Sequence, residues 1–546
     1  MVRILIILLA CLAAPIWAQP LVPVPPELVV ERPAQPDGKL ADILERGTLI
    51  VGVKNDYPPW GFLSDTGEII GLEVDLARDL ADRLGVALKL FAVTSSNRIE
   101  RVNSGMVDVV IATAGDTEER RLQADLLLPN YYSSGVVVYG RRDLGITRWS
   151  QLEGETICLS RGSYYNRALE TRYKVKGQYF AGRREALLAL QYGRCVGWAF
   201  DDTALTRYSH DNPSEVFDVM VPPRLVVPWA IFVAKGQGQA TLGRFVSDMI
   251  GEWHAGGRIL ELQDKWGIAR TGYIEAQHRV WSGVTNGVAD CARIDWDTRP
   301  GECVASDPFR AVPPVELSGF ALWLDQILGI DLRVFYTAYE RGRLMDGLAL
   351  TLGLSAASIL GALVVGVGLS LLNVGLTGRG GLGRVLQLPI RALITVARMT
   401  PPILQLYIVF FGLGGVFLAA PELTPGAFAI AVTIFSFYAG ATNTIILSHA
   451  LTQERYLDPG TALIRLMPRA FVRGFDGVVA ACVNIVKAAG MASAIAVGEL
   501  ISTINLLIGE GGDVATLMNG LLVFYFLLVL CVIWLFKIAR LRLGAT

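Results

Sequence analysis

The sequence predicts an α/β domain followed by an all-α transmembrane domain of about five helices. Charge is the first indication: 20 of the 201 residues from 346 to 546 are charged, against 79 of the first 345. So low a share is typical of a membrane-spanning region and excludes a wholly soluble enzyme. The second is the alternation of short apolar runs with helical stretches over 48–270, which favours a mostly parallel sheet covered by helices.

Overall composition narrows the function further. The chain has 546 residues, enough for several domains, with 49 Lys and Arg against 50 Asp and Glu. That balance gives no reason to expect nucleic-acid binding. Only four His are present and Cys-x-x-Cys is absent, so no metal site is expected. No motif places a nucleophile beside a base or two carboxylates together, so we expect no enzyme activity.

The N-terminus is typical of a secretory signal peptide over 1–18. Arg3 precedes an apolar run from Ile4 to Ala14, and Ala18 stands before Gln19. A lipoprotein signal ending at Cys11 is the alternative, although Leu9 is bulky where that signal prefers a small residue. The Pro-rich stretch 19–39 is interpreted as a spacer. The soluble part is therefore expected outside the cytoplasm.

Four cysteines agree with an oxidising compartment. Cys291 and Cys303 would close a short loop, and Cys158 and Cys195 could join neighbouring strands. The alternative is four unpaired thiols.

The spacing of apolar residues predicts individual helices and strands. Leu72, Leu76, Leu80 and Leu84 repeat every four residues, as on the core face of a helix. Polar residues 271–317, with the second cysteine pair, predict a linker. Residues 318–345 carry Trp323 and other apolar side chains among acids, which predicts a helix at the membrane surface. Strands are expected at Leu49–Val53, Val109–Ala112, Gly135–Tyr139, Ile157–Leu159 and Trp198–Phe200.

The transmembrane domain is expected over 346–546. Its connections 374–401 and 450–477 and its tail carry most of the Arg and Lys, whereas the opposite connections carry Glu422, Glu510 and Asp513. The positive-inside rule then places the Arg-rich connections and the C-terminus in the cytoplasm and the soluble domain outside. The expected spans are about 347–373, 402–420, 427–449, 478–507 (interrupted by Gly and one Lys) and 514–536.

Several ordered motifs cover 40–270. They are Leu49-Ile-Val-Gly-Val-Lys-Asn-Asp-Tyr-Pro-Pro-Trp-Gly-Phe62, Gly71-Leu-Glu-Val-Asp-Leu76, Asn103-Ser-Gly-Met-Val-Asp108 with its continuation to Arg120, Gly154 to Tyr164, and Gly193 to Asp201. Together they resemble the family 3 (polar amino acid) bacterial solute-binding proteins. The resemblance implies a two-lobed periplasmic-binding-protein-like fold that closes on its ligand, with one lobe near 48–133 and 222–270 and the other near 138–220.

The same resemblance assigns ligand roles suited to an amino-acid zwitterion. Arg120 occupies the position that holds the α-carboxylate, and Asp201 the position that holds the α-ammonium, with Asp202 as the alternative. Tyr57 and Trp60 would stack on the ligand and exclude water. Further donors would be Thr113, Gly115 and Thr117 from one lobe and Gly162, Ser163 and Tyr164 from the other.

Two further cations narrow the class of amino acid that we expect the chain to bind. Lys54 and Arg98 resemble positions that hold aspartate or glutamate in some members, and two cations beyond Arg120 suit an acidic side chain. The alternative is that both face solvent. We therefore expect a polar, and more narrowly an acidic, amino acid.

The second half resembles the polar amino acid ABC permeases. Arg398-Met-Thr-Pro-Pro402 is similar to a turn before the family's second core helix, and Asn484 to Leu500 is similar to its interrupted helix near the translocation path. Thr400, Pro401, Lys487 and Glu499 are the candidate residues of that path, because buried charge in a membrane usually marks function. Alternatively, Lys487 extends its amine to the cytoplasmic face.

One motif departs from the permease pattern. The family's cytoplasmic Glu-Ala-Ala loop, whose short helix docks the ATPase, is represented by a shorter stretch, 451–468, with only Gly460 and Leu466-Met-Pro468 in common. Pro459 would also break a helix there. The chain has no phosphate-binding Gly-x-x-x-x-Gly-Lys loop, so ATP and magnesium would be held by a separate ATP-binding subunit.

The resulting expectation is the binding and permease component of an ABC importer in a bacterial cytoplasmic membrane, pairing with itself or a homologous permease. A tethered binding domain would keep its ligand concentrated at the gate. An amino-acid receptor with a degenerate permease is the alternative that the short 451–468 stretch favours. A ligand-gated channel fits poorly, because no pore segment interrupts the two lobes.

Overall fold

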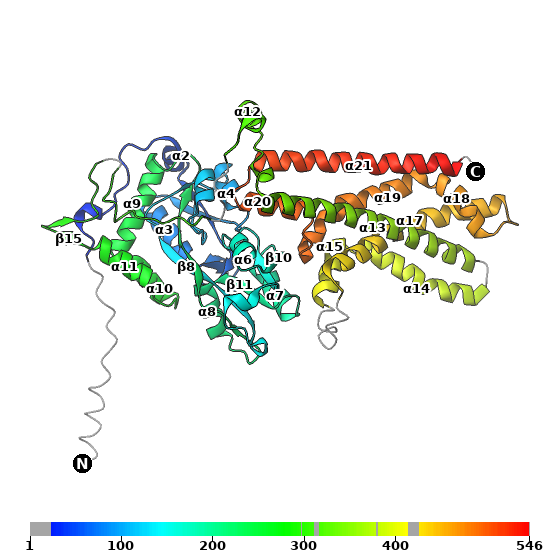
Figure 1. Cartoon of the computed structure of the whole chain (residues 1–546), viewed down its shortest axis with the longest axis horizontal. Helices are drawn as coiled ribbons and strands as arrows, with labels where there is room; N and C mark the ends of the chain where they lie inside the picture. Colours follow the sequence, from blue (N-terminus) through cyan, green and yellow to red (C-terminus); the bar gives the residue numbers. More distant parts are fainter. Residues whose placement is uncertain (1–22, 296–297, 311–315, 378–379, 413–424, 545–546) are drawn as a thin grey trace, which may run out of the picture. The chain divides into compact units, whose positions relative to one another are not determined.

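The computed structural model describes residues 23–295, 298–310, 316–377, 380–412 and 425–544, so the predicted signal peptide 1–18 lies outside it. The chain divides into two compact units. Figure 1 shows the helices and strands in the colours of the sequence. The first takes its described residues from 23–135, 201–208 and 225–310. The second takes them from 136–200, 209–224 and 316–544.

A five-stranded sheet forms the centre of the first unit, in the order β5-β1-β6-β14-β7. Strand β1 (Thr48–Val53) pairs in parallel with β5 (Ala87–Ala92) and β6 (Val109–Val110). The short β14 (Phe232–Val233) pairs antiparallel with β6 and with β7 (Asp125–Leu126). The chain therefore returns to this sheet after visiting the second lobe, as the two-lobed fold requires.

Helices cover this sheet because each has one apolar face. In α3 (Leu72–Leu84) the four leucines of the repeat are all fully buried, as predicted. Gly85, in the left-handed region at φ 70°, ends α3. The remaining elements are α2 (Gly38–Arg46), α4 (Arg98–Asn103), α5 (Glu118–Gln123), α9 (Thr241–Ala255), α10 (Arg258–Lys265) and a small sheet of β2 (Asp56–Tyr57), β3 (Gly61–Leu63) and β4 (Ile69–Ile70).

The segments expected to be a spacer and a linker are folded onto this unit. Leu28, beside the turn η1 (Pro26–Leu28), packs with Trp281 against the Cys291–Cys303 disulfide. Residues 271–310 form α11 (Gly272–Trp281), the hairpin β15 (Val284–Thr285) and β16 (Val288–Ala289), and the disulfide loop. Trp281 lies so close to α9 that a Cβ on Gly251 would be 2.3 Å from its ring, so this apolar packing holds the segment down.

The second lobe has its own six-stranded sheet, in the order β10-β9-β11-β8-β12, with β13 (Arg224–Trp229) paired to β8. Strand β9 (Thr156–Ser160) pairs in parallel with β10 (Lys176–Phe180) and β11 (Gly197–Asp201). The predicted Cys158–Cys195 disulfide joins β9 to the start of β11. The other elements are β8 (Tyr132–Arg141), β12 (Phe217–Val219), the turns η2 (Arg142–Leu144) and η3 (Trp149–Leu152), and helices α6 (Asn166–Arg172), α7 (Arg183–Gln191) and α8 (Asp202–Asp211).

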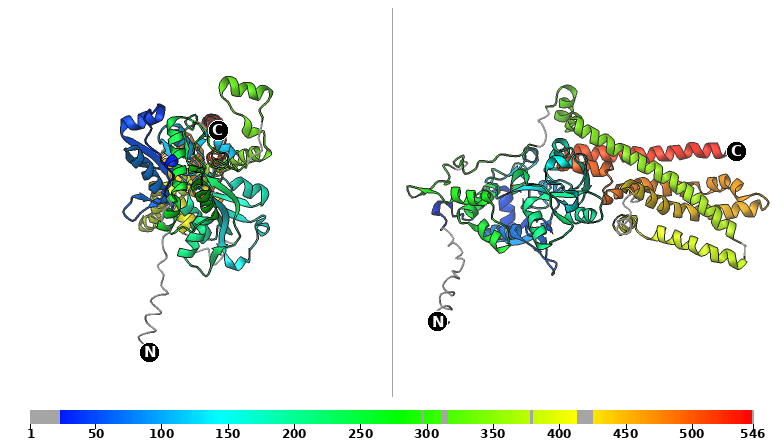
Figure 2. Two further views of the ribbon diagram at one scale, coloured as in Figure 1. Left: turned by 90° about the vertical axis from the view of Figure 1, so that its left-hand side faces the viewer. Right: turned by 60° about the horizontal axis from the view of Figure 1, so that its bottom comes forward.

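Four helices of the described chain are long and apolar enough to cross a membrane, or five if one bent pair is a single span. They are α13 (Ala338–Leu376), α17 (Ala427–Leu457), the run of α19 (Phe475–Ala488) into η7 (Ala489–Ile495), and α21 (Val514–Gly544). The long helices run side by side in Figures 1 and 2. Gly361, Gly366 and Gly440 allow α13 and α17 to approach closely, since a Cβ on Gly366 would lie 2.6 Å from that of Asn443.

Two parts of the helical region differ from the expectation. The stretch expected to be the loop 374–401 contains α14 (Gly380–Met399), and α14 is followed, across a bend of 107°, by α15 (Pro402–Tyr407) and the π-turn η5 (Ile408–Gly412). Pro401 and Pro402 account for the bend, because proline cannot continue the preceding helix. The predicted span 402–420 is thus described only to Gly412.

The connection 450–477 is also mostly helical. Helix α17 continues to Leu457, stops before Pro459, and is followed by α18 (Leu463–Arg473). The predicted interruption of 478–507 is present: η7 ends at Ile495, the next residue Ala496 has φ 60°, and α20 (Leu500–Gly509) begins after it. Residues 318–345 contain α12 (Gly319–Leu328), whose Phe320, Trp323 and Ile327 are exposed, the turn η4 (Arg333–Phe335) and the start of α13.

Candidate functional site

The predicted ligand residues of the first unit lie where strands end. Lys54 directly follows β1, Thr113 comes three residues after β6, and Asp201 is the last residue of β11. The carboxyl ends of parallel strands are where α/β folds usually bind ligands, because loops there are free to vary. Lys54 and Thr113 therefore follow strands of the five-stranded sheet, and Asp201 ends a strand of the six-stranded sheet.

Three cations of this group are almost fully buried. Lys54, Arg98 and Arg120 are 5%, 2% and 4% exposed, so the alternative that Lys54 and Arg98 face solvent is wrong. Arg98 Nη1 donates to the carbonyls of Ala112 and Thr113, and Arg120 Nη1 donates to the Gly115 carbonyl at 2.7 Å. Each guanidinium thus forms hydrogen bonds to backbone carbonyls of the loop after β6.

Two buried carboxylates oppose these cations. Asp201 accepts a hydrogen bond from the Tyr57 hydroxyl, and Arg98 and Lys54 act on it electrostatically. Asp202, the alternative, accepts instead from Ser134 Oγ at 2.6 Å and from the Thr203 amide at 2.7 Å. The geometry thus brings Asp201, rather than Asp202, together with Tyr57 and the cations.

Glu73 is the second carboxylate, and the sequence analysis did not select it. It is fully buried in the first turn of α3 and accepts from the Thr113 amide at 2.6 Å and from the Tyr131 hydroxyl at 2.5 Å. The sequence contains one indication of this buried site: Glu73 stands between Leu72 and Val74 in a helix with an apolar face. Such an acid needs buried partners, because an unpaired buried charge is costly.

Burial changes the protonation of this cluster. It raises the pKa of Asp201 to about 7, against the lowering effect of the Tyr57 hydrogen bond, and raises the pKa of Glu73 to about 7. Burial also lowers the pKa of Arg98 to about 9, helped by the nearby Arg120, and lowers the pKa of Lys54. All four groups therefore favour a partner of opposite charge.

The remaining residues of this unit shape the site. Trp60 is fully buried and packs edge-on against Tyr132 and Trp229, with ring centroids 4.3 and 4.9 Å apart, so its contacts are with core aromatics. Thr113 has φ 47°, an uncommon conformation for a residue with a branched side chain, and such strain is often found at functional sites. Thr117 Oγ1 accepts from the Arg120 amide and so caps α5.

The extension after residue 271 reaches this loop. Phe309 exchanges backbone hydrogen bonds with Asp116 and Glu118, and Ser306 Oγ donates to Asp116 at 2.8 Å. The segment that carries Gly115 and Thr117 is therefore fixed from a part of the chain that the sequence analysis took for a linker.

The predicted ligand residues of the second lobe are Gly162, Ser163 and Tyr164, which begin two residues after the end of β9. Gly162 has φ 77°, and a side chain at this position would be strained. Ser163 and Tyr164 are half-buried, and Tyr164 packs edge-on against Tyr165. We call residues 162–164 the ligand loop.

The second lobe is joined to the helical region by a polar cluster that the sequence analysis did not foresee. Arg167 lies 2.5 Å from Glu340 and over the ring of Tyr339, and Glu170 lies 2.8 Å from Arg343. The members, here named the docking cluster, are Arg167 and Glu170 of α6 and Tyr339, Glu340 and Arg343 of α13. Low exposure of these side chains makes the pairs stronger than surface ion pairs of the same geometry.

The candidate path residues occupy different settings. Thr400 and Pro401 form the bend between α14 and α15. Lys487 is exposed in the last turn of α19, whereas Glu499 is fully buried and caps α20 by accepting from the amides of Ile501 and Ser502. Within the described chain no ion pair joins Lys487 to Glu499.

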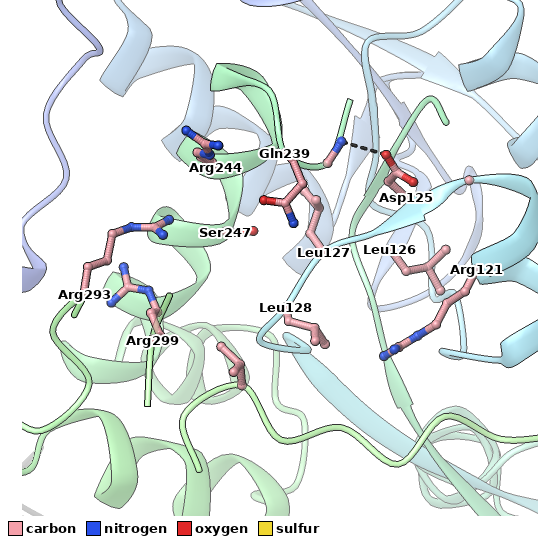
Figure 3. A pocket seen from close by; sticks show the side chains of 13 residues that line it. Arg121, Asp125, Leu126, Leu127, Leu128, Gln239, Arg244, Ser247, Arg293 and Arg299 are labelled. Atoms are coloured by element: carbon pink, nitrogen blue, oxygen red, sulfur yellow. Dashed lines mark hydrogen bonds between the residues drawn. The ribbon is translucent and has the colours of Figure 1, made fainter. Parts of the chain in front are cut away.

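A separate cavity of about 400 Å³ opens in the first unit (Figure 3). Arg244, Arg293 and Arg299 gather on one side of it, with Gln239 between them and Asp125. Arg293 and Arg299 both lie 2.6 Å from Asp248, so this wall is where the disulfide loop is fastened to α9. None of the predicted ligand residues lines the cavity. Within the described residues no group of three or more His, Cys, Asp or Glu could hold a metal ion.

Comparison with known proteins gives the context of this site. Residues 49–269 match the family model of the bacterial extracellular solute-binding proteins, family 3. The L-cystine-binding protein of Escherichia coli (strain K12) is 28% identical over 42% of this chain and 86% of its own length. The glutamine-binding protein of Geobacillus stearothermophilus is 30% identical over 32% of this chain and 69% of its own length. Among solved structures, a mutant of the arginine-binding protein from T. maritima has a TM-score of 0.40 at 27% identity, covering 42% of this chain and 99% of that one.

Proposed function

Because the chain belongs to the family 3 bacterial extracellular solute-binding proteins, we propose that it captures a polar amino acid outside the cytoplasmic membrane and delivers it inward. In this proposal the chain combines the binding and permease components of an ABC importer. The family membership concerns residues 49–269, and the transport role of the helical region is the part that experiment must test.

The observation that carries the proposal is the pairing of opposite charges in one buried site. Arg98 of α4 acts electrostatically on Arg120 of α5 and on Asp201 at the end of β11. Tyr57 of β2 donates a hydrogen bond to Asp201. A zwitterion has the complementary pattern, since its carboxylate suits a guanidinium and its ammonium suits a carboxylate. A neutral sugar or a cation alone would leave part of this buried charge unpaired, which is costly.

The narrower proposal concerns the side chain of the ligand. Lys54 is buried beside Asp56 and Ser95, with Nζ 3.6 Å from the first and 3.3 Å from the second, and this positive charge favours an acidic side chain. Relatives bind different amino acids: those already described bind L-cystine and glutamine, and a 25% identical protein of Pseudomonas aeruginosa binds L-glutamate and L-aspartate. Aspartate and glutamate are therefore the first ligands to test, with glutamine, cystine and arginine beside them.

The helical region supports the transport half of the proposal. Its helix is interrupted between η7 and α20, as are helices that line solute paths in many transporters. Helix α18 buries Leu466 and Met467 and exposes Ile464 and Arg465, so one face is available to a cytoplasmic ATP-binding subunit. That subunit would hold ATP and magnesium, and two permease domains, identical or homologous, would form the path.

ATP hydrolysis in liposomes tests the proposal. The chain would be co-expressed with an ATP-binding subunit of the polar amino acid class, and the five amino acids would be titrated. We expect one of them to stimulate hydrolysis, and Arg120→Ala to abolish the stimulation. If an amino acid binds but no ATP-binding subunit co-purifies or responds, the receptor alternative replaces transport.

A further inference from the structure

The second lobe touches the helical region through two arginines outside the docking cluster. Arg161 Nη2 donates to the carbonyl of Ser493 in η7 at 3.0 Å. Arg194 donates to the carbonyls of Phe410, at 2.8 Å, and Pro425, at 3.1 Å, and its guanidinium lies 4.3 Å from the Phe410 ring. The Ser493 carbonyl lies in the last turn of η7, and backbone carbonyls at the end of a helix carry partial negative charge.

Arg161 differs from Arg194 in its place in the sequence. It stands between the last residue of β9 and Gly162, the first residue of the ligand loop. Its backbone amide donates to the Phe180 carbonyl at 3.0 Å, which holds Arg161 at the edge of the sheet. Any rearrangement of residues 162–164 around a ligand therefore pulls directly on the backbone of Arg161. Arg194 lies next to the Cys195 disulfide and has no such connection.

The hydrogen bond from Arg161 ends at the interruption between η7 and α20. The Ser493 carbonyl also accepts from the amide of Ala496, at 3.1 Å, and Ala496 is in the left-handed region at φ 60°. The Arg161 guanidinium thus shares the carbonyl that ends η7. An alanine in this conformation costs on the order of 1 kcal/mol, so the break depends on its surroundings to persist.

Charge strengthens the link. The guanidinium of Arg161 is attracted to Glu499, the buried cap of α20 on the far side of the interruption. Its Nε is buried and has no hydrogen-bond acceptor among the described residues, so Arg161 retains a donor that the observed contacts do not use. Arg161 therefore contacts the end of η7 and acts electrostatically on the cap of α20.

We propose that Arg161 is a positioning residue that transmits the state of the ligand loop to the interruption between η7 and α20. It acts through the Ser493 carbonyl and Glu499 and does not itself bind the ligand. The inference rests on the proposed function, because it presupposes that an amino acid occupies the ligand loop. It specifies how that site would regulate the transmembrane region.

The test uses the full chain in nanodiscs and two measurements. Thermal unfolding with aspartate, glutamate, glutamine, cystine or arginine first identifies a binding amino acid, whose Kd is then measured by calorimetry. The second measurement is the rate at which a maleimide labels a Ser493→Cys variant in which Cys482 and Cys531 are replaced by Ala and Ser. This substitution keeps the backbone carbonyl that Arg161 binds.

We expect the amino acid to change the labelling rate about threefold or more when Arg161 is present. Arg161→Gln should abolish this change while the Kd stays within about twofold, and Arg161→Lys, which keeps the charge, should preserve part of it. Arg194→Gln is the matched control and should keep the ligand-dependent change, because Arg194 is not joined to the ligand loop.

Other outcomes overturn one proposal or the other. A ligand-dependent labelling rate that survives Arg161→Gln, or that Arg194→Gln abolishes equally, would contradict the role of Arg161. A labelling rate that never depends on a bound amino acid would do the same. If none of the amino acids raises the melting temperature of the unaltered chain, the proposed function itself fails.

Discussion

The phenol of Tyr57 donates a hydrogen bond to the carboxylate of Asp201, a residue 144 positions further along the chain. The bond connects β2 to the end of β11, and both side chains are buried. It leaves Asp201 with further acceptor capacity, because an ionised carboxylate has about four lone-pair sites. In the proposed function, a ligand ammonium would bind Asp201 while Tyr57 stays in place.

Asp201→Asn should weaken amino-acid binding by about 30-fold or more, because removing one partner of a buried charge pair costs roughly 2–5 kcal/mol. Calorimetric titration of the full chain measures the loss. Asp202→Asn is the control, and it should change the Kd less than about threefold, since Asp202 bonds Ser134 and the Thr203 amide. Equal losses in the two variants would show that the ammonium does not select Asp201.

Binding should tighten as pH rises. Burial raises the pKa of Asp201 to about 7, and only the ionised form attracts an ammonium group. A carboxyl with this pKa is mostly protonated at pH 5.5 and mostly ionised at pH 7.5, so the affinity should increase about 20-fold across that interval. Titrations at the two pH values give the ratio. Asp201→Asn should remove the dependence, and a steep dependence that persists in this variant would assign it to another group such as Glu73.

Arg120→Lys should weaken binding about 10- to 100-fold. A lysine has no planar pair of donors for the ligand carboxylate and cannot also reach the Gly115 carbonyl as Arg120 does. Arg121→Lys is the matched neighbour, because Arg121 pairs with Asp116 and is not a predicted ligand residue. Comparing Kd values separates the two positions. An Arg120→Lys variant that binds normally would exclude the bidentate role.

Asp248→Asn should destabilise the first unit. Arg293 and Arg299 both lie 2.6 Å from this carboxylate, and losing it leaves two neighbouring cations without their common partner. We expect a loss of about 1–3 kcal/mol and a melting temperature lower by several degrees. Asp264→Asn, whose partner Arg270 is exposed, should change stability by less than about 0.5 kcal/mol. Calorimetry of the unfolding transition distinguishes the two.

Reversing the Arg167–Glu340 pair should reveal how strongly the second lobe is held. Arg167→Glu and Glu340→Arg should each lower the melting temperature, because each places like charges together in a half-buried setting. The double variant should recover part of the loss, with a coupling energy of about 1–3 kcal/mol. If the destabilising effects of the two substitutions simply add, the docking cluster does not hold the lobe through this contact.

Much of the fold follows from local pattern. The leucine repeat of α3, the strands β1, β9 and β11, and both disulfides are where the sequence predicts them, because each depends on residues close together in the chain or on a strong compositional rule. The interruption near Glu499 was visible for the same reason.

The misplaced elements depend on distant contacts. Helix α14 was interpreted as a loop because its arginines were counted as connection charge, although Ile390 and Ile394 form a buried stripe along it. Residues 271–310 look polar, and only the packing of Trp281 against Gly251 shows that they are folded. Glu73 and the docking cluster join residues 40 or more positions apart, and no single-sequence pattern encodes such partners.

The docking cluster and the continuous chain also fix the ratio of binding domains to helical regions. Every helical region carries its own second lobe, attached through Arg167 and Glu170, so binding domains and helical regions are present in equal numbers. A cell that uses the proposed importer cannot raise its scavenging capacity by making extra binding domain alone, as it could with a free carrier. Uptake at low nutrient levels should instead scale with the number of complete chains in the membrane, and therefore with the membrane area that they occupy.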